Sequence, residues 1–339
     1  MAERRAAGCR VSVLLPLRDA EGTLPECLGS LRRQTLTELE ILAVDDGSRD
    51  GSRALLGALA CEEPRLRLLS SGGRGLVAAL NLGLEQARAP LLARMDADDV
   101  AHPERLACQV ERLAAGPRAD VLATAVELGG EPGPGMRRYV AWSNALLAHE
   151  QIVADLLVES PLVHPSVMVP TAWLRELGGY REFDGPEDYE LWLRAARHGA
   201  RFAKLPRPLL VWRDGPWRLT RASPRYAPER FRQLKLEALE AGPLRRPRPV
   251  VLWGGGPVAK SWCRALLARG HEVAAFVDVH PRRIGGRLQG RPVLDLAAGA
   301  GLYGALHLAA VGQPGGRERI RAAALARGLV EGRDLLAVA

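Results

Sequence analysis

The sequence predicts an α/β protein in which helices cover both faces of a parallel sheet, followed by a second, smaller parallel α/β module. Short apolar runs alternate with stretches of helical character through the first hundred residues, and this alternation is typical of such a sheet. Acidic turns follow two of the apolar runs, where parallel strands would end. After a stretch rich in proline and arginine, another apolar run leads into a glycine-rich turn.

The elements of the first module follow from the apolar pattern and the turn residues. An apolar run at 11–15, ended by Pro16, predicts the first strand. The pattern then predicts a helix over about 23–34, a strand at 39–44, a helix over 52–60, a strand at 66–69, a helix over 76–87 and a strand beginning at 91. Residues 116–138, rich in glycine, proline and arginine, are predicted to form a mobile loop.

Composition limits the class of protein. With 339 residues and 47% hydrophobic content the chain can form two domains, which we place at 1–242 and 250–339 with a linker at 243–249. The five cysteines lack metal-type spacing, so reduced thiols are expected. No apolar run is long enough to span a bilayer, and no signal-type block follows the N-terminus. A cytoplasmic protein is therefore expected, with peripheral contact at the inner face of a membrane left open.

The net charge of +8 comes almost wholly from arginine. With 5% aromatic residues the chain offers few stacking platforms for bases, so no nucleic-acid partner is expected. Basic residues become denser between Arg213 and Arg248, and anionic phosphates on a ligand or a membrane surface are their expected partners. Arg218 and Arg221 are candidates for phosphate contacts, with plain surface charge as the alternative.

Three carboxylates, Asp96, Asp98 and Asp99, end the strand that begins at residue 91. On an extended backbone Asp96 and Asp98 would project the same way and could share one cation. Oxygen ligands of this kind suit Mg²⁺ or Mn²⁺. The alternative, that Asp98 and Asp99 cap the next helix, stays open at this point.

A second acidic turn, at Asp45 and Asp46, follows the strand at 39–44. Gly47 and Ser48 suit a tight turn that caps the following helix. Asp45 leaves the strand toward a ligand crevice, where its carboxylate could accept from a base N–H or a ribose hydroxyl.

Glu187 and Asp188 follow Pro186 at the predicted start of another helix. Acidic residues at a helix start can cap the helix and compensate its dipole. The alternative interpretation is that one of these carboxylates is a reactive group. His164 precedes a proline, and a structural role competes there with acceptor or metal binding.

The motifs at 11–16, 44–50, 93–99 and 102–106 together resemble those of family-2 glycosyltransferases of the GT-A fold. The resemblance implies transfer of a sugar, with inversion at the anomeric carbon, from a nucleoside diphosphate donor, for which a UDP-sugar is favoured. The loop after the first strand departs from the family pattern, because Arg18 and Asp19 stand where asparagine is frequent.

The resemblance also implies roles for individual residues. Asp45 would contact the base, Asp96 the ribose, and Asp98 a Mn²⁺ or Mg²⁺ ion that bridges the diphosphate. Pro16, Asp46 and Arg94 lie in the same motifs and are assigned to the donor site. The family places its catalytic base at the second residue of a Glu-Asp pair, which makes Asp188 the base and Glu187 an orienting residue. Glu190 is an alternative to Glu187, and Asp214 stands where relatives carry a metal-assisting histidine.

The second module begins with an apolar run at 250–253 and the turn Gly254-Gly255-Gly256. Gly254, Gly256 and Asp278 have the spacing with which backbone amides and an acid hold a nucleotide. The module resembles the small Rossmann-like domain at the N-terminus of sugar acyltransferases. A bound nucleotide and a scaffolding or oligomerising role are both open, and no hydride-transfer residues are present.

These features predict an enzyme that adds one sugar to a glycan or a lipid-linked acceptor in polysaccharide or glycolipid assembly. The chain lacks the glutamine- or arginine-containing motif that marks processive polysaccharide synthases of the family. The alternative is a nucleotide-sugar-binding scaffold with a degenerate transferase site. Retention of Asp45, Asp96, Asp98 and Asp188 favours the enzyme.

Overall fold

The computed structural model describes residues 8–215 and 223–339. The chain divides into two compact units, one formed by Met1–Ile152 with Pro161–Ala227 and the other by Val153–Ser160 with Pro228–Ala339. Both units are α/β structures, as the sequence predicts.

Within the described residues, the first unit contains one sheet of mixed direction with the strand order β3-β2-β1-β4-β7-β6-β8-β5. Strands β3, β2, β1 and β4 run parallel, whereas β7 is antiparallel to β4 and β6. The strands are β1 (Val11–Leu17), β2 (Leu39–Asp45), β3 (Leu66–Ser70), β4 (Leu91–Arg94), β5 (Val100–Ala101), β6 (Val121–Gly130), β7 (Met168–Pro170) and β8 (Phe202–Asp214).

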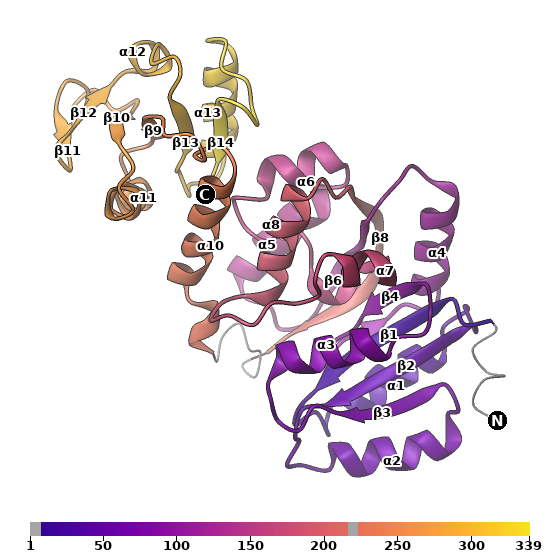
Figure 1. Cartoon of the computed structure of the whole chain (residues 1–339). Helices are drawn as coiled ribbons and strands as arrows, with labels where there is room; N and C mark the ends of the chain where they lie inside the picture. The colour runs from indigo at the N-terminus through magenta and orange to yellow at the C-terminus, as the bar shows by residue number, and fades with distance from the viewer. Residues whose placement is uncertain (1–7, 216–222) are drawn as a thin grey trace. The chain divides into compact units, whose positions relative to one another are not determined.

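Helices cover both faces of the parallel half. Leu14 of β1 and Val44 of β2 face Gly83 on α3, while Val13 and Ile41 face the opposite core with α1 and α2. Figure 1 shows α2 and α3 on opposite sides of β1 to β3. The helices of this unit are α1 (Leu24–Arg32), α2 (Ser52–Glu62), α3 (Leu76–Gln86), α4 (Arg105–Ala115), α5 (Pro134–Ala145), α6 (His149–Asp155), α7 (Thr171–Glu176) and α8 (Glu187–Arg197).

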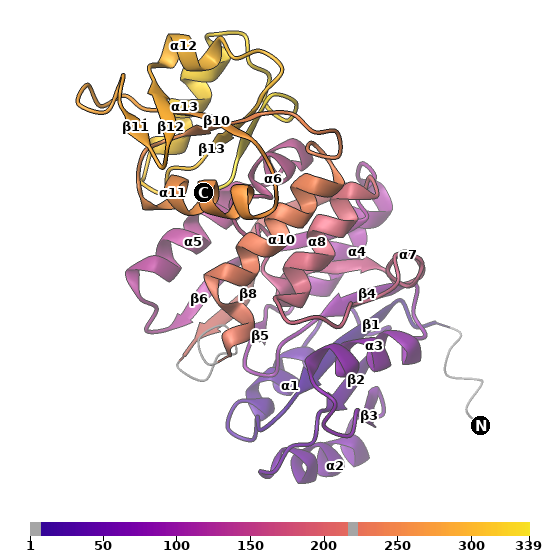
Figure 2. The same ribbon diagram turned by 60° about the vertical axis from the view of Figure 1, so that its left-hand side comes forward.

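The predictions for residues 11–94 are confirmed, except that β1 continues through Pro16 to Leu17. The prediction of a loop over 116–138 is wrong. Residues 121–126 are buried in β6, which pairs with β8, and α5 begins at Pro134 and runs alongside β6 (Figure 2). The glycine and proline cluster that suggested a loop spans the end of β6, the turn after it and the start of α5.

In the described part of the second unit the strand order is β11-β12-β10-β9-β13-β14, with β12, β10, β9, β13 and β14 parallel. The strands are β9 (Val250–Trp253), β10 (Val273–Val277), β11 (Arg287–Leu288), β12 (Arg291–Leu294), β13 (Leu306–Ala309) and β14 (Leu335–Ala337). The helices are α10 (Pro228–Ala241), α11 (Pro257–Ala268), α12 (Leu296–Ala300) and α13 (Gly316–Leu325).

Alternate residues of β9 supply two hydrophobic cores. Val250 and Leu252 pack with α11, whereas Val251 and Trp253 pack in the core on the other face. Leu236 and Leu239 of α10 join the first of these cores, so α10 packs with the second unit. The domain boundary at 243–249 stays a prediction.

Candidate active site

The carboxyl ends of β1, β2 and β4 carry the predicted donor residues. Because these strands are parallel neighbours, their ends meet at one edge of the sheet. In the register of the sheet Pro16 lies beside Val44, and Leu17 lies beside Asp45. Arg94 ends β4, and the acidic turn follows directly.

Asp45 and Asp46 differ in what their carboxylates contact. Asp46 Oδ1 accepts hydrogen bonds from Ser71 Oγ at 2.5 Å and from Gly75 N at 3.0 Å, so Asp46 supports the loop before α3. Asp45 Oδ1 accepts from Ser48 N at 3.0 Å. Its Oδ2 is buried and has no hydrogen-bond partner among the described residues, which leaves an acceptor available for a ligand.

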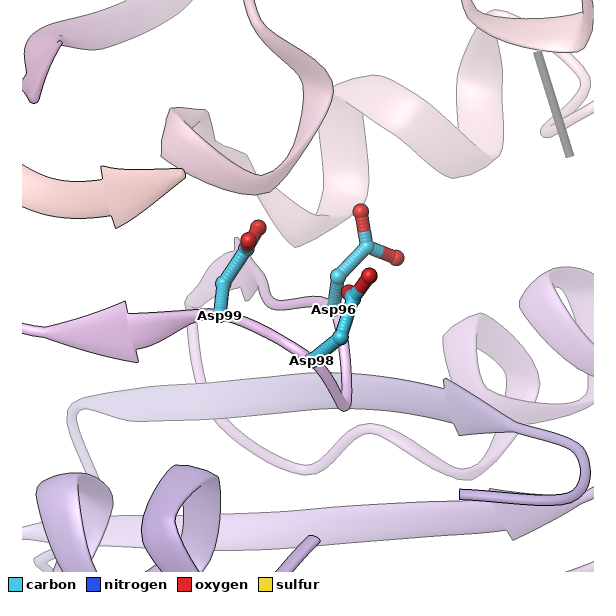
Figure 3. Close-up of side chains that lie close together, drawn as sticks. All are labelled: Asp96, Asp98 and Asp99. Atoms are coloured by element: carbon cyan, nitrogen blue, oxygen red, sulfur yellow. The ribbon is translucent and has the colours of Figure 1, made fainter. Parts of the chain in front are cut away.

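Asp96, Asp98 and Asp99 form a cluster in which one oxygen of each carboxylate lies within 4.8 Å of the others (Figure 3). The backbone here is a turn closed by Asp99 N donating to Asp96 O at 3.3 Å, so the predicted extended geometry is wrong although the carboxylates do gather. The capping alternative is also wrong, because Asp99 leads into β5 and α4 starts only at Arg105. Hard oxygen donors converging in this way fit Mg²⁺ or Mn²⁺.

Asp99 was not among the predicted metal ligands. Its side chain is buried, and Oδ1 accepts from Arg213 N on β8 at 2.9 Å. The third carboxylate is therefore fixed by a contact with a distant strand, which sequence spacing does not reveal. In the sequence its only signal is that it follows Asp98.

Arg94 and Arg105 hold the end of β4. The buried Arg94 side chain forms an ion pair with Asp96, and its Nε has no hydrogen-bond partner among the described residues. Arg105 donates to Arg94 O at 2.7 Å and to Gln109 Oε1 at 3.2 Å. Burial lowers the pKa of Arg105 to about 10, so its cation remains charged at neutral pH.

Glu187 and Asp188 begin α8, as predicted, with Pro186 at the N-cap position. Glu187 is buried and accepts from the Tyr226 hydroxyl at 2.8 Å, and burial raises the pKa of its carboxyl group. Asp188 is only partly buried, and its Oδ1 accepts from Tyr189 N at 2.7 Å. Of the two carboxylates, Asp188 is thus the one more exposed to solvent.

Tyr180 is buried in the first unit. Burial raises the pKa of its hydroxyl, the charge of Arg94 lowers it, and the carboxylates of Glu187, Asp188 and Asp96 raise it further. Sequence reasoning did not single out Tyr180.

His164 is buried next to this hydroxyl. Its Nε2 lies 3.0 Å from Tyr180 Oη, and its Nδ1 lies 4.0 Å from Glu187 Oε1. Burial and the charge of Arg94 lower the pKa of His164 well below its ordinary value, so the ring is neutral. The ring thus forms part of the support for Tyr180 and Glu187.

The remaining predicted residues of the first unit have mixed outcomes. Arg218 and Arg221 lie outside the described residues. Glu190, the alternative to Glu187, is paired with Arg194 at 2.9 Å and Arg181 at 3.6 Å, which accounts for its charge.

In the second unit, contacts within the unit account for Gly254 and Asp278 but not for Gly256. Gly254 has φ +115°, and a Cβ there would lie 2.5 Å from Val311 Cγ2. A Cβ on Gly255 would lie 2.3 Å from Asp278 Oδ2, whereas Gly256 faces open space. Asp278 accepts from Arg283 Nη1 at 2.8 Å and from His280 N at 2.9 Å. A ligand role for Gly254, Gly256 and Asp278 stays a prediction.

No helix within residues 8–215 or 223–339 has the length and apolar character that crossing a lipid bilayer requires.

Comparison with known proteins identifies the class. The profile of glycosyl transferase family 2 matches residues 12–178. The chain is 32% identical over 207 residues to the amylovoran biosynthesis glycosyltransferase AmsE of Erwinia amylovora, which covers 60% of this chain and 76% of AmsE. It is 29% identical over 213 residues to the putative glycosyltransferase EpsE of Bacillus subtilis, which covers 61% of this chain and 74% of EpsE.

Solved structures show the same fold. S. aureus TarS 1-349 in complex with UDP-GlcNAc superposes with a TM-score of 0.55 at 20% identity, over 68% of this chain and 66% of that one. The mannosyltransferase PcManGT from Pyrobaculum calidifontis, in complex with GDP-Man and Mn²⁺, gives a TM-score of 0.50 at 21% identity, over 77% of this chain and 79% of that one.

The first unit therefore has the GT-A fold of glycosyltransferases, and the predicted fold class is confirmed. The chain belongs to glycosyl transferase family 2.

Proposed function

We propose that the first unit transfers one sugar from a nucleoside diphosphate donor to an acceptor hydroxyl, with inversion at the anomeric carbon. The observation that carries the proposal is the cluster of Asp96, Asp98 and Asp99 carboxylates after β4, at the same edge of the sheet as Asp45. Asp188, at the start of α8, is the candidate base. Membership of the family supports the same reaction.

In this proposal Asp45 accepts from the base through its available oxygen, and Asp96 contacts the ribose. Pro16, Asp46 and Arg94 shape the same edge of the sheet. Asp98, with Asp99 beside it, would hold Mn²⁺ or Mg²⁺, which supplies positive charge next to the diphosphate. A UDP-sugar is the favoured donor because TarS binds UDP-GlcNAc, although PcManGT binds GDP-Man with Mn²⁺.

The chemistry assigned to this chain is a single displacement. Asp188 takes the proton of the acceptor hydroxyl. At the same time the oxygen of that hydroxyl attacks the anomeric carbon from the side opposite the diphosphate. The bond between that carbon and the phosphate oxygen breaks, and its electron pair leaves with the diphosphate. Glu187 orients the first turn of α8. Arg218 and Arg221 remain the candidates for phosphate contacts.

The name of AmsE supports a role for this chain in polysaccharide assembly. AmsE is an amylovoran biosynthesis glycosyltransferase, and we propose a glycan or lipid-linked acceptor for this chain, reached by peripheral contact with a membrane surface. For the second unit we propose a scaffolding role, because Gly254, Gly255 and Asp278 are engaged by contacts within the unit.

Thermal stabilisation tests the donor site. UDP-, GDP- and dTDP-sugars are added in turn to the purified full chain, with and without Mn²⁺, and the melting temperature is followed. A ligand that binds only the folded protein, at a free concentration of a hundred times its Kd, raises the free energy of unfolding by about 2.7 kcal/mol. A donor that binds therefore raises the melting temperature. Release of nucleoside diphosphate is then measured with p-nitrophenyl glycosides or water as acceptors. Absence of stabilisation by every donor would contradict the proposal.

A further inference from the structure

Residues 223–227 form a short turn whose side chains contact the start of α8. The turn η3 (Pro224–Tyr226) is closed locally, because Ser223 Oγ accepts from Arg225 N at 3.3 Å and Ala227 N donates to Pro224 O at 3.0 Å. Arg225 and Tyr226 are therefore presented as a rigid pair to the loop at 182–187.

Arg225 fixes the loop before the helix. Its Nε donates to Gly185 O at 2.6 Å, and its guanidinium carbon lies 5.9 Å from the centre of the Phe183 ring. The ring lies directly on Gly185, where a Cβ would come within 2.2 Å of it. An outer contact at 3.6 Å joins Arg225 Nη1 to Glu182. The guanidinium thus engages both the backbone and the aromatic side chain of this loop.

Tyr226 fixes the first residue of the helix. Its hydroxyl donates to Glu187 Oε2 at 2.8 Å, and the Arg225 Nε lies 3.9 Å from the same oxygen. Only 3% of Glu187 is exposed, and His164 lies beside its other oxygen at 4.0 Å. A buried carboxyl group with contacts at both of its oxygens has little freedom to move.

We propose that Arg225 and Tyr226 form a positioning clamp that sets the direction of the Asp188 carboxylate through Gly185 and Glu187. This inference rests on the proposed function, in which Asp188 is the base. Asp188 directly follows Glu187, so the clamp fixes the backbone that carries it. A base displaced by about 1 Å from its reacting geometry can cost a factor of about 100 in rate.

The test uses Tyr226→Phe in the full chain, since this change removes only the hydroxyl. We expect kcat for release of nucleoside diphosphate to fall about 10- to 100-fold, with donor-site affinity unchanged. Affinity is measured by calorimetry with UDP, GDP and dTDP in turn, in the presence of Mn²⁺. Tyr303→Phe is the matched control, because Tyr303 lies in the second unit and is 81% exposed. It should turn over like the unmodified chain.

Two results would overturn the clamp. One is an unchanged kcat in Tyr226→Phe. The other is a loss of nucleotide affinity as large as the loss of kcat, which would assign Tyr226 to the donor site instead. If Tyr226→Phe melts several degrees below the unmodified chain, Glu187→Leu, which has no acceptor for the Tyr226 hydroxyl, takes its place. It should show the same selective loss of kcat, and normal turnover in it would again overturn the clamp.

Coupling between the partners gives a readout that a purely structural role would not produce. Because Tyr226 acts through Glu187, a double variant changed at both Tyr226 and Glu187 should lose no more kcat than either single variant. A fold-loss of kcat equal to the product of the two single losses would contradict the proposal. Asp188→Asn is measured in parallel. Normal turnover in that variant would refute the base assignment itself, while an inactive Asp188→Asn beside a fully active Tyr226→Phe would refute the clamp alone.

Discussion

The hydroxyl of Tyr180 lies 3.0 Å from Nε2 of His164, and both side chains are buried. His164 Nδ1 also lies 4.0 Å from Glu187 Oε1, and Glu187 directly precedes Asp188 at the start of α8. A buried polar contact thus supports the first turn of the helix that carries the candidate base. The proposed removal of the acceptor proton by Asp188 depends on this support.

Asp98→Ala should weaken donor-site binding that depends on manganese. Removing one of three clustered carboxylates takes away a ligand and part of the negative charge that offsets the ion. We expect a loss of about 10- to 100-fold in the affinity for UDP with Mn²⁺, as found when the surroundings of a metal site are disturbed. Calorimetry with and without Mn²⁺ measures it. Glu111→Ala, an exposed acid on α4, is the control. Unchanged, metal-independent affinity in Asp98→Ala would argue against the site.

Gly254→Ala should destabilise the second unit. A non-glycine residue at φ +115° is strained, and its Cβ would also overlap Val311, so we expect a loss of about 1–3 kcal/mol in the free energy of unfolding. Urea unfolding provides the measurement. Gly256→Ala is the matched control, because its φ is −82° and a Cβ there meets nothing within 4 Å. Equal stability of the two variants would contradict the packing explanation of this turn.

His164→Asn should reduce the sensitivity of the fold to acid. Burial and Arg94 hold the pKa of His164 well below its ordinary value, so the unfolded chain takes up a proton at a pH where the folded ring stays neutral. Folding stability is therefore full above about 6.5, the ordinary histidine pKa, and falls as the pH drops below it. The slope contributed by one such group is at most about 1.4 kcal/mol per pH unit.

The measurement is the free energy of unfolding from pH 5 to pH 8. The slope of the unfolding free energy against pH is compared between variants. The absolute values are not compared, because Asn also changes the packing contribution to stability by an amount that does not depend on pH. His198→Asn, which alters an exposed ring, should keep the slope of the unmodified chain. The same slope in His164→Asn would show that other groups, such as the neighbouring Glu187, set the acid sensitivity.

The parallel half of the first sheet could be predicted because each strand is an apolar run that ends in turn residues. Strand β6 could not, since it depends on pairing with β8, which lies some eighty positions further on, and its glycine-rich end suggested a loop. Local pattern says little about strands whose stability comes from distant neighbours.

The acidic residues of the site could be predicted because Asp45, Asp96, Asp98 and Asp188 stand in recognisable motifs at the ends of elements. Their supporting residues could not. Tyr180 and Tyr226 look like ordinary core tyrosines in the sequence, and only tertiary contacts give them a role. The predicted extended backbone at Asp96 and Asp98 was wrong because the turn closes on Asp99.

Paired measurements on Asp188→Asn test the central claim most directly. The change keeps the size of the side chain and removes the proton acceptor, so release of nucleoside diphosphate should fall by a factor of about 10² to 10⁴. Calorimetry on the same preparation should give the affinity of the unmodified chain for UDP with Mn²⁺. Turnover equal to that of the unmodified chain would contradict Asp188 as the base, and with it the proposed reaction geometry.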